Sequence, residues 1–147
     1  MAFIKEMIFK ISSVIENLTP SGLTDGEPER TEITLEGFYK TDGESVEITY
    51  TDKTEGGRVV SVITAEPGCV RVVRRGGVES DMIFKTGEIH KSLYTVSPYS
   101  FDTEVRCRKI RYGLTRSGGR LEVFYDMSIG GADKSVRMRI DCTPKEN

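Results

Sequence analysis

The sequence predicts an all-β protein, a single antiparallel up-and-down β-barrel of about 8 to 10 strands. Apolar and polar residues alternate with a period of two along most of the chain, and no helical face is longer than two turns. Short turn signals, among them Asp42-Gly43, Pro67-Gly68 and Gly76-Gly77, separate the alternating segments. Closing such a sheet removes its exposed edges, which favours a barrel, and a β-sandwich is the alternative.

The first three expected strands have apolar residues at alternate positions. Segment 17–30 is rich in Thr, Pro, Ser, Gly and acidic residues and is expected to be a flexible loop. Gly37 lies in the middle of the second strand and is expected to mark a bulge or a bend, because glycine weakens a regular strand. The Asp42-Gly43 turn joins the second and third strands as a hairpin. The three strands are expected at 5–15, 32–41 and 46–51.

The fourth expected strand, 58–66, is apolar on both faces. A strand that is apolar on both faces indicates that its outer face is covered. The N-terminal segment or a partner subunit could cover it. Tight Gly-containing turns lead to the strands that follow, and one helical turn is expected around Glu88 to Ser92. These later strands are expected at 69–75, 81–86 and 91–96.

The long strand expected at 99–109 separates an apolar face from a charged one almost completely. One face therefore meets the core and the other meets water. Segment 112–120 is expected to be a Gly/Ser loop, and 143–147 a tail. The last hairpin is expected to pair strand 121–129 with strand 136–142.

Length and composition predict one folded domain over residues 1–147. The chain is 37% hydrophobic and 30% charged and has a net charge of −2. No apolar run is long enough to span a membrane, and the first ten residues do not form a secretory signal. The three cysteines are widely spaced, without a Cys-x-x-Cys pair, which argues against a disulfide framework and a zinc site. A cytoplasmic location is expected, and the oligomeric state is left open.

Short motifs spread from about Ile4 to Asp141 resemble one family. They are Gly37-Phe38-Tyr39, Arg74-Arg75-Gly76, Phe84 with Gly87, Tyr94-x-x-x-Pro98-Tyr99, and Gly119-Arg120-Leu121-Glu122-Val123-Phe124-Tyr125-Asp126-Met127. Together they resemble the YwiB-like family of small bacterial proteins, calycin-type (lipocalin-like) β-barrels of unknown function. Where that family has Thr-Pro-Tyr-Gly, this chain has Ser97-Pro98-Tyr99-Ser100. The resemblance implies a calycin-like fold in a bacterial cytoplasm, and it supplies no catalytic residues.

Patterns typical of enzymes and cofactor sites are missing from the sequence. His90 is the only histidine and lies in a charged, turn-like stretch, where a surface position is expected. One histidine and three scattered cysteines do not offer a metal site. No nucleotide-binding or EF-hand motif occurs, so no cofactor is expected. Two of the 23 acidic residues could still meet in a barrel mouth, but no catalytic constellation is visible and the protein is predicted not to be an enzyme.

A basic run in the second half suggests an outer-face interaction with nucleic acid or protein. Nucleic-acid binding needs such charge next to aromatic residues. However, the chain has a pI near 5.6, and a strand surface of paired charges explains the same pattern, so nucleic acid is not expected as a partner. The residues of this alternative are Arg106, Arg108, Lys109, Arg111, Arg116 and Arg120.

The interior of the barrel is the leading candidate for function. A barrel of about eight strands can hold a packed core or one small ligand. The inward faces are apolar with several phenols, so either a filled core or a pocket for a small apolar molecule fits the pattern. The candidate ligand-binding residues are Tyr39, Tyr50, Tyr99, Phe101, Tyr125 and Met138.

Overall fold

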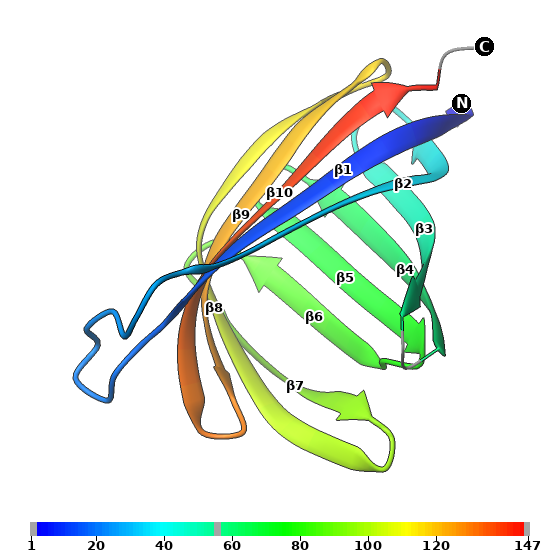
Figure 1. Ribbon diagram of the computed structural model, residues 1–147. Helices are drawn as coiled ribbons and strands as arrows, with labels where there is room; N and C mark the ends of the chain where they lie inside the picture. Colours follow the sequence, from blue (N-terminus) through cyan, green and yellow to red (C-terminus); the bar gives the residue numbers. More distant parts are fainter. Residues whose placement is uncertain (1–2, 55–56, 146–147) are drawn as a thin grey trace.

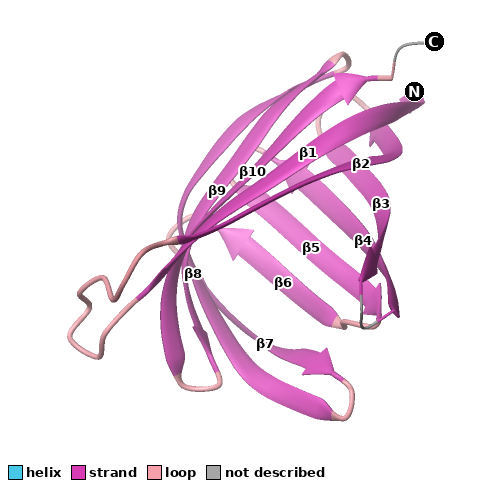
Figure 2. Ribbon diagram, viewed as in Figure 1, coloured by secondary structure: helices cyan, strands magenta, loops and turns pink. Residues whose placement is uncertain are grey.

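A computed structural model describes residues 3–54 and 57–145, and this part of the chain forms ten antiparallel strands without a helix (Figures 1 and 2). No helix long and apolar enough to cross a membrane occurs there. The strands are β1 (Phe3–Asn17), β2 (Glu29–Thr41), β3 (Val46–Thr54), β4 (Gly57–Glu66), β5 (Cys69–Gly76), β6 (Ser80–Lys85), β7 (Ile89–Val96), β8 (Tyr99–Thr115), β9 (Gly118–Ile129) and β10 (Ala132–Pro144).

The strands form one sheet in the order β6-β5-β4-β3-β2-β1-β10-β9-β8-β7, which curls into a nearly closed barrel. Its two edge strands, β6 and β7, approach each other at one point, where Glu79, just before β6, and Thr95 of β7 form reciprocal backbone hydrogen bonds of 2.9 Å. The amide of Gly87 also donates to the carbonyl of Cys107 at 2.9 Å. The predicted antiparallel barrel is therefore confirmed over the sandwich.

The barrel has two ends. At the terminal end, β1 begins and β10 ends (Figure 1). At the loop end lie segment 18–28 and the turns that follow β5, β7 and β9. Segment 18–28 carries its own backbone hydrogen bonds, including Thr19 N to Leu23 O at 2.8 Å.

Strand β8 continues past the end that the sequence predicted. The register with β9 shifts between Cys107 and Lys109, where Arg108 is an extra residue in a β-bulge. The bulge moves the inward positions from odd to even numbers, so that Ile110, Tyr112 and Leu114 follow Cys107 toward the core. The loop predicted at 112–120 from its Gly and Ser residues is therefore wrong, because β8 continues to Thr115 and β9 begins at Gly118.

Three other expectations need correction. The helical turn predicted at Glu88 to Ser92 is replaced by the start of β7, which pairs regularly with β8. Of the bulge or bend expected at Gly37, the bulge is wrong, because the register of Gly37 is regular with both β1 and β3. A Cβ there would collide with the carbonyl oxygen of Thr49, so glycine permits a close approach of β2 to β3. The N-terminal segment does not cover β4, because β1 pairs with β2 and β10.

The core fills the interior at the terminal end of the barrel. Inward side chains from nearly all strands pack there, and the largest are fully buried, which matches the expected alternation of apolar and polar positions. Phe9 and Tyr50 lie with ring centroids 6.4 Å apart. The largest fully buried side chains are Tyr39, Phe9, Phe84, Met7, Ile48, Ile63, Leu121 and Ile140.

Candidate functional site

The loop end of the barrel contains a cavity of about 310 Å³ between β1, β5, β6, β7, β9 and β10. Its size is at the lower limit of typical small-molecule pockets. Its walls are mostly apolar. The lining residues are Ser13, Ile15, Val72, Arg74, Met82, Phe84, Tyr94, Tyr125, Met127, Ile129, Lys134, Val136 and Met138.

A second compartment of about 250 Å³ adjoins this cavity on the side of β2, β3 and β4. The two compartments share Ser13, Arg74 and Tyr94 as lining residues. Tyr50 and Asp52 line only the second one. The barrel is thus packed at its terminal end and contains two adjoining compartments, together called here the interior cavity, at its loop end.

The polar groups that line the interior cavity are three charged side chains, three phenols and the hydroxyls of Ser13, Thr31 and Ser61. Arg74, Lys134 and Asp52 bring the charges, and Tyr50, Tyr94 and Tyr125 bring phenol hydroxyls. No described residue forms a hydrogen bond with these three hydroxyls, so each can bond to a bound molecule. Burial raises the pKa of Tyr125 to about 12, against a smaller opposing effect of the Arg74 charge. Tyr125 is therefore a protonated hydrogen-bond donor at neutral pH.

Three of the six candidate ligand-binding residues line the interior cavity: Tyr50, Tyr125 and Met138. Tyr39 lies instead in the packed core, where its hydroxyl donates to the carbonyl of Thr115 at 2.6 Å. Burial raises the pKa of Tyr39 above its usual range. This residue supports the barrel and does not face the cavity.

Tyr99 and Phe101 were predicted to face inward and do not line the cavity. Tyr99 is 66% exposed and Phe101 is 40% exposed. Both lie on the same face of β8 as the buried Thr103 and Val105, so the predicted alternation of faces is correct. The β7–β8 hairpin extends beyond the barrel at the loop end, where no opposite strand covers that face (Figure 1).

Sequence reasoning missed Arg74 and Tyr94, which both compartments share. Counting inward positions along β5 from Val70 and Val72 would have placed Arg74 inside. His90 was expected at the surface, but it is partly buried, in register with the inward Val105. Its Nε2 lies 3.3 Å from the backbone carbonyl oxygen of Asp81.

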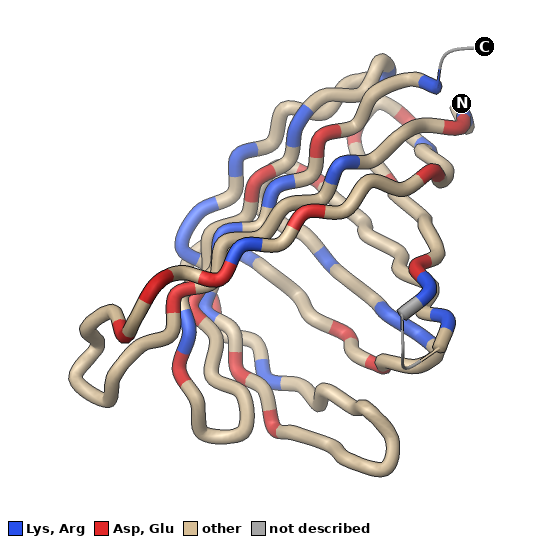
Figure 3. Tube along the Cα trace, in the orientation of Figure 1, with Lys and Arg blue, Asp and Glu red and all other residues tan. Residues whose placement is uncertain are grey.

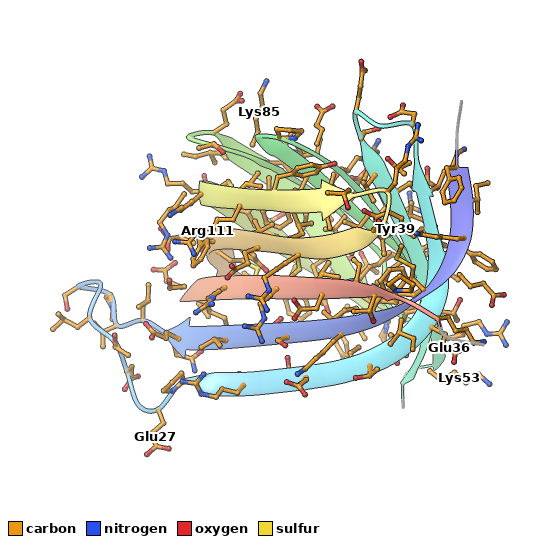
Figure 4. The ribbon with its side chains drawn as sticks, turned by 90° about the horizontal axis from the view of Figure 1, so that it is seen from above. Glu27, Glu36, Tyr39, Lys53, Lys85 and Arg111 are labelled. Atoms are coloured by element: carbon orange, nitrogen blue, oxygen red, sulfur yellow. The ribbon has the colours of Figure 1, made fainter. Side chains whose placement is uncertain are left out.

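The six residues of the basic run lie on the outer wall of the barrel, and three of them form ion pairs with acidic residues. Figure 3 shows acidic and basic residues interleaved along these strands, and Figure 4 shows Arg111 on the outside. Arg120 pairs with Asp141 at 2.6 Å, Arg108 with Asp126 at 3.4 Å and Arg111 with Glu122 at 3.9 Å. Arg106, Lys109 and Arg116 have no such partner in the described chain. This charge-paired wall does not favour the nucleic-acid alternative.

Other sites are less suited to a ligand. A depression of about 420 Å³ lies beside segment 18–22, and one of about 650 Å³, lined in part by Phe101, lies where the β7–β8 and β9–β10 hairpins meet. Charged residues such as Glu104 line both, and both are more open to solvent than the interior cavity. Among residues 3–54 and 57–145 there is no cluster of His, Cys, Asp or Glu that could hold a metal ion. The three cysteines are free, and burial raises the pKa of the Cys142 thiol to about 12, far from that of a reactive thiolate.

A model of a domain of unknown function, DUF1934, matches residues 17–140. This chain belongs to that family. It is also 28% identical over 120 residues to the uncharacterized β-barrel protein YwiB of Bacillus subtilis, a match that covers 82% of this chain and 80% of that protein. The crystal structure of that protein superimposes with a TM-score of 0.79 and 25% identity, covering 94% of this chain and 92% of the other.

These comparisons confirm the resemblance and the β-barrel fold. The DUF1934 family carries no assigned activity, so it transfers no site residues to this chain. The protein is therefore a β-barrel of unknown function whose candidate site rests on the geometry of its own interior.

Proposed function

We propose that this protein binds a small, mostly apolar molecule in the interior cavity, without catalysing a reaction. The observation that carries the proposal is the contrast between the two ends of the barrel. The terminal end is filled by fully buried side chains, whereas the loop end contains a partly open cavity of about 310 Å³ with mostly apolar walls and a second compartment beside it. Small-molecule sites are apolar concavities with a few polar groups, as here.

Burial of an apolar ligand against these walls gives the driving force. Each CH₂ group removed from water contributes about 0.8 kcal/mol, so a ligand of modest size gains useful affinity before any polar contact. A cytoplasmic setting is part of the proposal, supported by the free cysteines of the chain.

The test is a titration with an uncharged apolar fluorophore whose emission rises in an apolar environment. Binding is expected at one site per chain. Ser13 lines both compartments, so Ser13→Phe should reduce binding at least tenfold by filling the space. Thr34→Phe is the matched control, because Thr34 is exposed on the outer face of neighbouring β2. Absence of binding to the wild type, or equal binding by both variants, contradicts the proposal.

Native mass spectrometry of the protein purified from its own host gives an independent readout. A molecule that co-purifies with the wild type and is absent from Ser13→Phe supports the interior cavity as its site. Co-purification that is equal in both proteins places the molecule elsewhere and contradicts the proposal.

A further inference from the structure

We propose that the ligand is an amphipathic anion, with a singly charged oxyanion head group, of which a carboxylate is the simplest, held by Arg74. This inference rests on the proposed function and names the chemical class of the ligand. It starts from the position of one cation inside the barrel. Arg74 follows the buried Val70 and Val72 at the next inward position of β5 and lines both compartments.

The guanidinium of Arg74 has no partner in the described chain. The backbone carbonyl of Arg74 accepts a hydrogen bond of 3.2 Å from Arg75 Nη1, and this bond does not involve the Arg74 guanidinium. Arg71, three residues earlier on the outward face of the same strand, forms two bonds to Asp81, of 2.9 and 2.6 Å. A partly buried cation without an anion is unfavourable, so the barrel gains stability when an anion enters.

One unpaired hydroxyl lies beside Arg74, and a second lines the same cavity. Ser80 is directly opposite Arg74 in the β5–β6 register, is 4% exposed, and its Oγ has no hydrogen-bond partner among the described residues. Tyr94, on the far side of the gap between β6 and β7, also faces the cavity with a free hydroxyl. A guanidinium fork with neighbouring O–H donors is the arrangement that binds a carboxylate or a phosphate ester oxyanion.

The charges of the interior cavity fit a single negative charge. Two cationic side chains, Arg74 and Lys134, and one carboxylate, Asp52, line the two compartments, which leaves one positive charge unbalanced. A monoanion would neutralise it. The remaining walls, including Met82, Phe84 and Met138, are apolar and accept a hydrocarbon tail.

The experiment compares three ligands that have the same tail and different heads. Decanoate, decanol and decylamine displace the uncharged fluorophore from the wild-type protein at neutral pH. Decanoate is expected to bind at least about tenfold more tightly than decanol, because a charge-assisted hydrogen bond replaces a neutral one, and decylamine most weakly.

Substitutions of Arg74 test whether this residue causes the preference for decanoate over decanol. Arg74→Gln is expected to bind decanoate and decanol equally, with decanol affinity unchanged, and Arg74→Lys to keep part of the preference because it retains the charge without the planar fork. Arg75→Gln is the matched control, since Arg75 is the next residue and is exposed on the outer face. It should keep the full preference.

The outcomes separate this inference from the proposed function. Fluorophore and decanol binding without a preference for decanoate in the wild type overturns the anion but leaves the apolar site. A preference that persists unchanged in Arg74→Gln overturns Arg74 as the head-group residue. Failure of every ligand to bind the wild type overturns both. If Arg74→Gln does not fold, the wild-type order of the three heads and Arg74→Lys decide.

Discussion

The hydroxyl of Tyr39 on β2 donates a hydrogen bond of 2.6 Å to the carbonyl oxygen of Thr115, 76 residues later at the end of β8. Tyr39 is fully buried, so the bond crosses the packed terminal end of the barrel and joins strands that are not neighbours in the sheet. It supports the end of the barrel that the cavity does not occupy.

Tyr39→Ala is expected to lower the free energy of unfolding by about 3 to 5 kcal/mol, because it removes a buried ring. Tyr39→Phe keeps the ring and leaves the Thr115 carbonyl without this donor, at a cost of about 1 kcal/mol. Denaturant melts of both variants measure the two contributions. Equal losses for Phe and Ala would show that the hydroxyl and not the ring carries the stability.

Tyr99→Ala is expected to change the free energy of unfolding by no more than about 0.5 kcal/mol, as is usual for exposed positions. Tyr99 is 66% exposed at the start of β8 and belongs to no packed layer. Denaturant melts measure this change as well, and Tyr39→Ala gives the value for a buried tyrosine for comparison. A loss of several kcal/mol would mean that the β7–β8 hairpin folds back onto the barrel.

Gly37→Ala is expected to cost about 2 kcal/mol or more, as overpacking does. A Cβ at Gly37 would collide with the Thr49 carbonyl oxygen and lie 2.9 Å from the Phe9 ring, and the backbone oxygen cannot move without breaking the sheet. Gly113→Ala is the control, because its nearest neighbour is the Arg120 carbonyl oxygen at 3.2 Å. Thermal melts in which both variants lose equal stability would contradict the close β2–β3 approach.

Alkaline pH is expected to destabilise the wild type more than Tyr125→Phe. Burial raises the pKa of Tyr125 from 10.0 to about 12, so the unfolded chain releases this proton first. The contribution is complete below pH 10 and is lost as the pH rises toward 12, by about 1.4 kcal/mol per pH unit. Unfolding free energies of both proteins across this range measure the difference. A constant difference would show that Tyr125 titrates normally.

Local sequence patterns predicted most of the strands and several of the side chains that point into the barrel. Period-two alternation depends only on the direction of successive side chains, so strands such as β3 and β4 could be found without knowing their partners. The same alternation correctly assigned Tyr50, Tyr125 and Met138 to the interior. Gly-containing turns likewise act within a few residues, and they marked the hairpins.

Only the tertiary structure decided which inward positions face a core, a cavity or solvent. Tyr39 and Tyr50 occupy the same kind of alternating pattern in the sequence. The hydroxyl of Tyr39 donates to the Thr115 carbonyl in the core, whereas Tyr50 lines a cavity. Tyr99 follows the alternation correctly and is exposed, because β8 extends beyond the opposite wall. Whether an inward side chain packs against other side chains depends on strands far away in the sequence and on how the sheet closes. A local sequence pattern holds no information about either.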